Sequence, residues 1–514
     1  MSTSTSRYSE FHLKSLDWDL ADGILLDEDG AAIYETEYSG LLLSIIRLND
    51  VATLKRYLAT HPRALGPGET HSYDPFWAAA YHGSTDALRV LLEHYAAHPN
   101  QTEAPNARGY LLLNVACQSA HVGTARFLLD NQLAAAEIHA QEAHGMTALL
   151  AAAASFVDSA YAENDRRDSM RDHVARGEEL MLLLLDRGAC AQDAITQGDK
   201  QPRDTVLTLA ISQASSKLVK RLIDEGADIY TKKMHFFNDG LFGGSDTIWD
   251  VTPLHIGGFY SNVEGIRTLL DNRGSGIHVA DIVSCRDSLG RLPLHWAAGG
   301  PGPLEDAMSH AAGTMRLLLA SNPNTVNAQD KKGETALHYA VKSHARRGSK
   351  YSDTVKILCE NGADAGLRDR NGQTPLHCLG FHILGYHPID TGLFALLLAH
   401  GADVGDSDAD GNTPLHLAAR NLQYVEAVRF LLSQGADISV KNLKGNTPLH
   451  EAAGGNIWLQ EMKLTPDDRM RVQDEMMRLL QDPGVNLIDQ ENAAGKTPRV
   501  IREERRNTWL GKRA

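Results

Sequence analysis

The chain has 514 residues, too many for one ordinary compact domain, so we expect several domains or one long repeat array. Its composition is typical of a globular protein, with 43% hydrophobic and 22% charged residues. The net charge of −15 argues against a direct nucleic-acid partner, because phosphate binding needs clustered lysine and arginine.

Residues 1–40 hold nine acidic residues against Arg7 and Lys14, and we interpret them as a solvated acidic N-terminal arm. The alternative is a docking segment for a basic partner. The longest apolar run, Ala148 to Val157, is too short to span a bilayer, so no membrane partner is expected. The five cysteines form no closely spaced pairs, which indicates a reducing compartment. We therefore expect the protein in the cytoplasm or the nucleus.

The first half of the chain predicts a series of short helix pairs. Each pair shows apolar residues at helical spacing and small residues that allow close packing. The fourth is interrupted by a charged stretch at 156–177, which we predict to be an insertion. The pairs cover residues 41–61, 75–98, 108–141, 147–185 and 204–233.

The second half carries a recurring tetrapeptide, which reveals an internal repeat. The steps between copies are 40, 43, 39, 39 and 34 residues. The copies are Thr252-Pro-Leu-His255, Leu292-Pro-Leu-His295, Thr335-Ala-Leu-His338, Thr374-Pro-Leu-His377, Thr413-Pro-Leu-His416 and Thr447-Pro-Leu-His450, with a degenerate Thr497-Pro498.

Residues 408–440 are the clearest copy of this unit. Asp408 and Gly411 have the chemistry of a tight turn. Thr413 is suited to cap a helix, and the proline that follows it suits the first helical position. A second apolar stripe runs from Val425 to Leu432, and Gly435 can end that helix in a left-handed conformation.

This unit resembles the ankyrin repeat. The resemblance implies an all-α repeat solenoid of about twelve stacked helix-turn-helix units joined by β-hairpin fingers. We divide the chain into the arm at 1–40, divergent repeats at 41–250, and well-matched repeats with a C-terminal cap at 251–510.

Three segments depart from the repeat. Residues 234–249 predict an enlarged finger whose aromatic residues could contact a partner. Residues 344–350 predict a loop. Thr465-Pro466-Asp467-Asp468 predicts a helix start, with the helix running to about Gln481.

The 23 histidines raise the possibility of metal binding or catalysis. The resemblance assigns the histidine of each tetrapeptide a structural role between neighbouring units. His377, Cys378, His382 and His387 are of zinc-ligand type, but His377 belongs to the signature and no regularly spaced fourth ligand follows. Gly495-Lys496-Thr497 lacks the other features of a phosphate-binding loop. We predict no catalytic residues, no metal and no cofactor, and hence no enzyme.

The resemblance places the partner-binding groove on the exposed side of each first helix and on the finger tips. Aromatic and cationic side chains at these positions suit a protein partner. The predicted partner-binding residues are Tyr81, His82, Phe259, Tyr260, Lys331, Lys332, Lys342, Arg370, Phe381, His382, Arg420 and Asn421.

We therefore expect a monomeric intracellular scaffold or adaptor that binds a protein through this concave groove. One alternative is a transcription co-regulator or pathway-regulatory protein. Another is an enzyme or small-ligand binder that uses the groove as a pocket. Fold alone does not decide among these alternatives.

Overall fold

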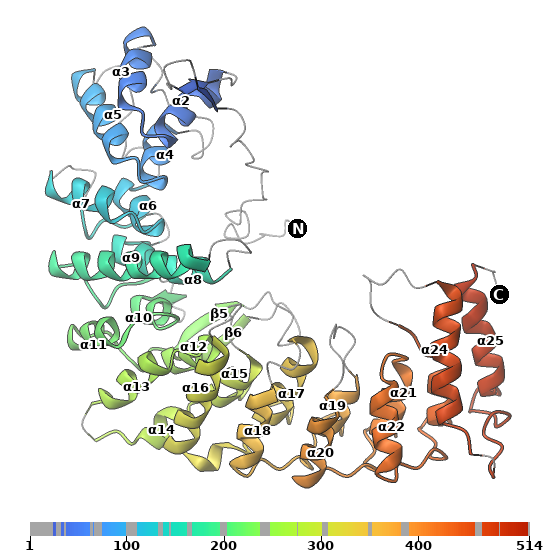
Figure 1. Ribbon diagram of the computed structural model, residues 1–514. Helices are drawn as coiled ribbons and strands as arrows, with labels where there is room; N and C mark the ends of the chain where they lie inside the picture. Colours follow the sequence, from blue (N-terminus) through green and yellow to red (C-terminus); the bar gives the residue numbers. More distant parts are fainter. Residues whose placement is uncertain are drawn as a thin grey trace, which may run out of the picture. The chain divides into compact units, whose positions relative to one another are not determined.

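The computed structural model is an array of short helices with small two-stranded hairpins (Figure 1). It describes residues 24–26, 32–34, 38–61, 65, 74–98, 110–131, 137–142, 145–161, 167–195, 203–236, 247–274, 276–300, 307–347, 352–381, 390–457, 465–482 and 484–511. Within these, it describes no side chains for 24–40, 158–161, 167–171, 234–236, 307–309, 346–347 and 381. The chain divides into a first unit (1–155 with 171–189) and a second unit (156–170 with 190–514).

The described elements of residues 24–186 are the strands β1 (Ile24–Leu26) and β2 (Ala32–Tyr34) and the helices α2 (Tyr38–Arg47), α3 (Val51–Thr60), α4 (Pro75–Tyr81), α5 (Thr85–Ala97), α6 (Leu112–Gln118), α7 (Val122–Asp130), α8 (Ala148–Tyr161) and α9 (Arg167–Asp186). In the first unit α2, α4 and α6 pack in sequence order as one layer, and α3, α5 and α7 form the other. The helix pairs predicted at 41–61, 75–98 and 108–141 are confirmed.

The following elements up to residue 299 are β3 (Ala194–Ile195), β4 (Asp204–Thr205), α10 (Val206–Ala210), α11 (Ser216–Asp224), β5 (Lys233–Phe236), β6 (Thr247–Val251), α12 (Pro253–Tyr260), α13 (Val263–Asp271), α14 (Val279–Val283) and α15 (Pro293–Gly299). The remaining elements are α16 (Ala307–Ser321), the 3₁₀ helix η5 (Pro323–Thr325), α17 (Ala336–Arg347), α18 (Ser352–Glu360), α19 (Pro375–Phe381), α20 (Thr391–Ala399), α21 (Pro414–Arg420), α22 (Val425–Ser433), α23 (Pro448–Ala453), α24 (Pro466–Leu479) and α25 (Pro498–Trp509).

The second unit has the same two layers (Figure 1). Its first helices α12, α15, α17, α19, α21 and α23 pack side by side in sequence order. Its second helices α13, α16, α18, α20, α22 and α24 form the other layer. Alanine pairs such as Ala418 and Ala419 are fully buried where first helices meet, because a methyl side chain lets two helix backbones approach closely. The predicted count of about twelve repeats stays a prediction.

Three predicted segments differ from the structure or are partly confirmed. The predicted insertion at 156–177 is mostly helical, since α8 runs to Tyr161 and α9 begins at Arg167. The loop predicted at 344–350 is wrong at its start, because α17 continues to Arg347. The enlarged finger is confirmed as the antiparallel hairpin of β5 and β6, in which Phe236 pairs with Thr247. The predicted contact of its aromatic residues is not tested, because the Phe236 side chain and residues 237–246 lie outside the described part of the chain.

The predicted acidic arm contains one described feature. Strands β1 and β2 pair antiparallel, with Leu25 opposite Ile33. Helix α2 begins at Tyr38, inside the predicted arm. The rest of residues 1–37 lies outside the described part of the chain.

Candidate partner-binding surface

In the second unit, six of the described fingers end in a turn that is closed by one carboxylate or amide side chain. Asp408 Oδ1 accepts hydrogen bonds from the backbone N–H groups of Asp410 (3.0 Å) and Asn412 (2.8 Å). Gly411 has a φ of 76°, a left-handed conformation that favours glycine. Asp287, Asp330, Asp369, Asn442 and Asn492 close their turns in the same way. The turn predicted at Asp408 and Gly411 is therefore confirmed.

Backbone hydrogen bonds join the tip of each finger to the next. For example, the N–H of Arg370 donates to the carbonyl of Lys332 at 2.8 Å. The other bonds run from Ser288 N–H to Trp249 O, Lys331 N–H to Leu289 O, Ala409 N–H to Asn371 O, Leu443 N–H to Asp410 O, and Ala493 N–H to Lys444 O, at 2.8–3.0 Å. The tips thus form one continuous row, fixed by main-chain atoms.

The exposed side chains of this row differ from finger to finger. We define the finger edge as Lys331, Lys332, Arg370, Asn371, Asp410, Leu443 and Lys444, all of which are exposed. The sequence predicted Lys331, Lys332 and Arg370 on this surface, and the structure places all three there. Leu443 was missed, although it is 76% exposed. An apolar residue inside the turn Asn442-Leu443-Lys444-Gly445 was the signal available in the sequence.

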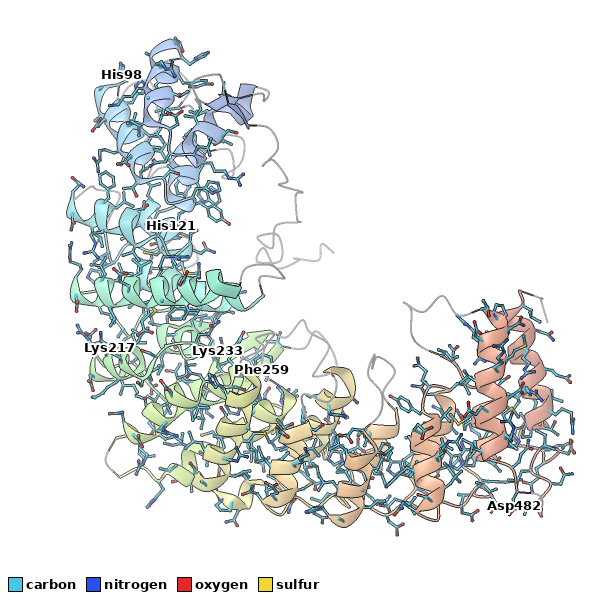
Figure 2. The ribbon with its side chains drawn as sticks, in the orientation of Figure 1. His98, His121, Lys217, Lys233, Phe259 and Asp482 are labelled. Atoms are coloured by element: carbon cyan, nitrogen blue, oxygen red, sulfur yellow. The ribbon has the colours of Figure 1, made fainter. Side chains whose placement is uncertain are left out.

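The predicted exposure of Phe259 and Tyr260 is wrong. The Phe259 side chain is only 4% exposed and that of Tyr260 only 8%. Figure 2 labels Phe259, which belongs to α12. Phe259 packs edge-on against Trp296 of α15, with the ring centroids 6.1 Å apart. The cause is Gly258, where a Cβ atom would lie 3.0 Å from the carbonyl oxygen of Pro293, so α15 approaches α12 unusually closely. The two rings therefore belong to the core and are not accessible to a partner.

Lys342 and Arg420 lie on the first helices as predicted, but each is held by a carboxylate. Lys342 forms an ion pair with Glu334, and Arg420 Nε donates to Glu451 Oε2 at 2.9 Å. Burial opposes the charged form of Glu334, but the adjacent Lys342 ammonium outweighs it, and the pKa of Glu334 is lowered. A partner would therefore meet neutral pairs at these two places, not bare cations.

The remaining predicted contact residues are Asn421, Phe381 and His382, of which only the Asn421 side chain is described. Asn421 is 6% exposed, which contradicts its prediction as a surface contact. Its Oδ1 accepts the backbone N–H of Gln423 (3.2 Å), so the side chain closes the turn after α21. The side chain of Phe381 and the whole of His382 lie outside the described residues.

In the first unit, Tyr81 and His82 belong to an aromatic cluster at the end of α4. The Tyr81 ring stacks on Trp77, with centroids 4.5 Å apart and 13° between the planes, and the His82 ring lies edge-on to Tyr81. His82 is exposed, and its pKa is lowered by partial burial and by the nearby Arg47. Trp77 was missed in the sequence, although it lies one helical turn before Tyr81. We call Trp77, Tyr81 and His82 the α4 cluster.

The signature histidines have the structural role that the resemblance implied. His416 Nδ1 accepts the backbone N–H of Thr413 (3.1 Å), which leaves Nε2–H to donate to the carbonyl of Asn446 in the next repeat (3.0 Å). The corresponding Nε2 contacts of the other five are 3.1–3.2 Å, made by His255, His295, His338, His377 and His450. Burial lowers the pKa of His255, His295 and His338 to about 4.

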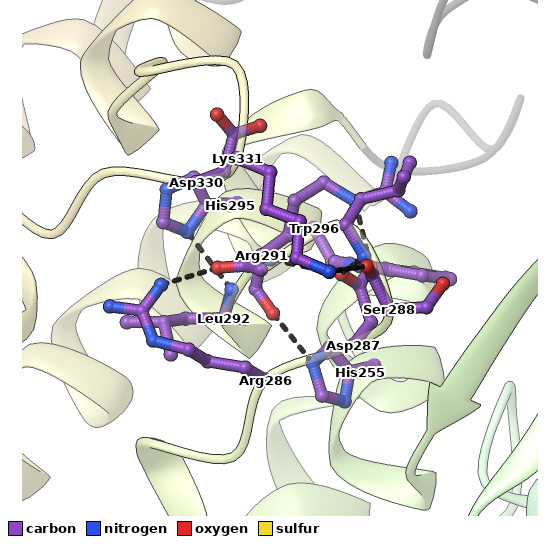
Figure 3. Close-up of polar contacts among 12 residues, drawn as sticks. His255, Arg286, Asp287, Ser288, Arg291, Leu292, His295, Trp296, Asp330 and Lys331 are labelled. Carbon is purple, nitrogen blue, oxygen red and sulfur yellow. Dashed lines mark hydrogen bonds and ion pairs between the residues drawn. The ribbon is translucent and has the colours of Figure 1, made fainter.

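A buried charged group supports the finger before α15 (Figure 3). Arg291 Nε donates to Asp287 Oδ2 at 2.7 Å, and Trp296 Nε1 donates to the same oxygen at 3.0 Å. The Arg291 guanidinium carbon lies 5.0 Å from the Trp296 ring centre. Because Asp287 also closes its own turn, this one carboxylate fixes both the finger and the helix.

The described residues contain no cluster of three or more histidine, cysteine or acidic side chains that could hold a metal ion. Both nitrogens of His377 are occupied, by Thr374 and by the carbonyl of Asn412. The thiol of Cys378 is buried, and burial raises its pKa to about 12. Within the same described part, no helix is both long and apolar enough to cross a bilayer.

Comparison with known proteins agrees with this geometry. A family model of ankyrin repeats matches residues 304–382, 345–442 and 381–462. The finger, the capped first helix and the bridging histidine recur outside that range, at His255 and His295. The chain therefore contains ankyrin repeats, which are typically non-enzymatic protein-interaction modules.

The relatives share only their repeat segments with this chain. A homologue of transient receptor potential cation channel subfamily A member 1 from Caenorhabditis elegans is 33% identical over 140 residues, covering 26% of this chain and 10% of that protein. Human inversin is 35% identical over 92 residues, covering 18% and 7%. The Drosophila melanogaster neurogenic locus Notch protein is 35% identical over 122 residues, covering 23% and 4%. The chain thus matches a tenth or less of each relative's length.

Among solved structures, the ankyrin repeat domain of Bcl-3, a member of the IkappaB protein family, is 26% identical. The match covers 49% of this chain and 94% of that domain, with a TM-score of 0.33. This score is too low to support an argument from shared geometry.

Proposed function

We propose that this protein is an intracellular scaffold or adaptor, monomeric in the cytoplasm or nucleus, that binds a protein partner along the finger edge and the adjoining first helices. The observation that carries the proposal is the finger edge itself. Main-chain hydrogen bonds hold its tips in register, so the side chains of Arg370, Leu443 and Lys444 are not needed to form it.

The chemistry of the finger edge favours a protein as the partner. Cationic groups at Lys331, Lys332 and Arg370 are followed by the apolar Leu443. A fixed row of charged and apolar side chains matches the mixed polar and apolar surface of a typical protein partner. Because the backbone is already ordered, binding costs little conformational entropy.

A quantitative affinity-capture experiment tests this proposal. The full chain is used as bait in extract of its native cells, beside the double variant Arg370→Glu/Leu443→Asp. We expect partners recovered by the natural chain to fall at least about tenfold with the variant, which corresponds to about 1.4 kcal/mol. The Leu443→Asp change removes an apolar contact residue, and the Arg370→Glu change reverses a charge. Both changes should weaken binding of the partner.

The matched control is Arg316→Glu/Ile277→Asp. Arg316 is an exposed residue of the second helix α16, and Ile277 is 37% exposed in the segment before α14, so neither belongs to the finger edge. This control should recover the same partners as the natural chain. Equal recovery by the natural chain and the Arg370→Glu/Leu443→Asp variant would show that the finger edge does not bind the partner.

A further inference from the structure

Two groups of arginines stand out among the described residues of α24 and α25. The first group is neutralised within the fold. Arg502 and Arg506 of α25 both pair with Asp474 of α24, and Arg499 lies 3.0 Å from Asp489. The second group, Arg469 and Arg505, lies around a cavity instead.

This cavity has a volume of about 420 Å³. It lies where the chain leaves α23, where α24 begins and where α25 ends. We call it the C-terminal pocket, and it is lined by Asn456, Pro466, Arg469, Arg505, Thr508 and Trp509. Its volume falls within the range of known small-ligand sites. None of its described lining residues is acidic.

The two arginines differ in how they are held. Arg505 donates from Nε (2.9 Å) and Nη2 (2.6 Å) to the carbonyl of Gly454, which fixes its guanidinium. Its other N–H groups make no hydrogen bond to any described residue. The Arg469 guanidinium has no hydrogen-bond or ion-pair partner among the residues that the structure describes. The pocket therefore offers one fixed and one uncommitted guanidinium, which together favour an oxyanion.

The other residues that line the pocket restrict the shape of a ligand that fits it. Trp509 is half-buried beside the arginines, so its indole offers a flat apolar surface next to the cationic groups. The amide of Asn456 and the hydroxyl of Thr508 supply further polar contacts. A ligand that satisfies all of these groups carries an oxyanion beside an aromatic ring.

We infer that the C-terminal pocket binds an aromatic residue of a peptide that bears an oxyanion. Two kinds of peptide group present this chemistry, namely the α-carboxylate of a C-terminal aromatic residue and the phosphate of a phosphorylated tyrosine. This site is separate from the finger edge, so the inference does not depend on the proposed function.

Isothermal titration calorimetry on the full chain tests the inference with three small probes at neutral pH and low salt. N-acetyl-L-phenylalanine carries a carboxylate, phenyl phosphate carries a phosphate, and N-acetyl-L-phenylalanine amide is uncharged. We expect at least one of the two anions to bind at least about tenfold more tightly than the amide, because the arginines recognise charge. The tighter of the two anions identifies the source of the oxyanion.

Variants of one helix give the matched comparison. Arg469→Ala should weaken binding of the preferred anion about tenfold, whereas Arg471→Ala should leave it unchanged. Arg471 lies on the same helix, α24, but its side chain is 81% exposed and does not line the pocket. Trp509→Leu should weaken the anions and the amide alike, because it removes the ring surface.

Three results would overturn the inference. The first is that neither anion binds at millimolar concentration. The second is that the amide binds as tightly as the anions. The third is that Arg469→Ala and Arg471→Ala lose affinity equally, as expected for a general effect of positive charge. Melting curves of each variant establish that a loss of binding does not come from unfolding.

Discussion

At the scale of single residues, His416 and its five counterparts each join two neighbouring repeats through one ring. Nδ1 holds the start of the ring's own helix, and Nε2–H bonds the main chain of the next repeat. Both contacts need the neutral ring with its proton on Nε2. The stability of the stack is therefore coupled to pH.

The sign of this coupling follows from the lowered pKa values. Burial lowers the pKa of His255, His295 and His338 to about 4, against 6.5 for an unperturbed histidine. Between these values the unfolded chain binds more protons than the folded chain. We expect the free energy of unfolding to be at its full value above about pH 6.5 and to fall as the pH drops toward 4, by up to about 1.4 kcal/mol per pH unit for each such histidine.

Urea unfolding at several pH values checks this expectation. His338→Gln lowers stability but removes one titrating group, so its free energy of unfolding should depend less steeply on pH than that of the natural chain. His139→Gln serves as the control, because His139 is exposed. A pH dependence that is equally steep in the natural chain and in His338→Gln would contradict the role given to the buried ring.

The structural role of the histidines could be predicted because their signature recurs in each repeat and the resemblance to the ankyrin repeat implied that role. The burial of Phe259 and Tyr260 could not. It depends on Trp296 in the following repeat and on the close approach that Gly258 allows. The ion pair of Arg420 was missed for a related reason, since Glu451 lies in the repeat after Arg420.

At the scale of elements, local capping chemistry predicts where helices begin better than where they end. The start of α24 at Pro466 was predicted, and its capping box has Thr465 and Asp468 bonded to each other. The predicted end near Gln481 falls two residues beyond the observed Leu479. Helix α17 likewise continues to Arg347, through residues predicted as a loop. Arginine and alanine suit a helix as well as a loop, so the sequence there contained no stop signal.

The carboxylate of Asp474 is one of the groups that attach the terminal helix α25 to α24. Asp474 accepts hydrogen bonds from both Arg502 and Arg506 (2.6 Å from Arg506). Asp474→Ala should destabilise this pair of helices by about 1 kcal/mol, a value kept small because Asp474 is 39% exposed and solvent screens the pairs. Amide hydrogen exchange should therefore speed up across residues 498–509.

Glu503→Ala is the control for this prediction, because Glu503 lies exposed on α25. Its exchange rates should match those of the natural chain. If Asp474→Ala also leaves exchange in α25 unchanged, the two ion pairs do not hold the helix.

At the scale of the whole molecule, the repeat pattern predicts the two-layered architecture. In each unit the first helices pack against neighbouring first helices, and the second helices against neighbouring second helices. The pattern does not predict which repeats carry function, since contact residues are those that the fold leaves free to vary. This is why the finger edge and the α4 cluster were predicted in part, while the C-terminal pocket was found only in the structure.

The five cysteines offer a test that covers the whole chain. All are free thiols. Burial raises the pKa of Cys359 to about 11 and of Cys378 to about 12, and it also raises those of Cys117 and Cys285. We expect DTNB to label the exposed Cys190 quickly, Cys285 slowly, and Cys117, Cys359 and Cys378 only on unfolding, because the thiolate is the reacting form. Cys190→Ser should abolish the fast phase, and a fast phase that survives this change would show that a buried thiol opens to solvent.

The row of finger tips has a consequence for how this protein could change over generations. Its hydrogen bonds use backbone atoms, which every residue type except proline supplies. A mutation at Leu443, Lys444 or Arg370 can therefore alter what the surface recognises while the folding stability of the protein is kept. Single substitutions can then produce new binding specificities, and each one is selected only for its effect on partner binding.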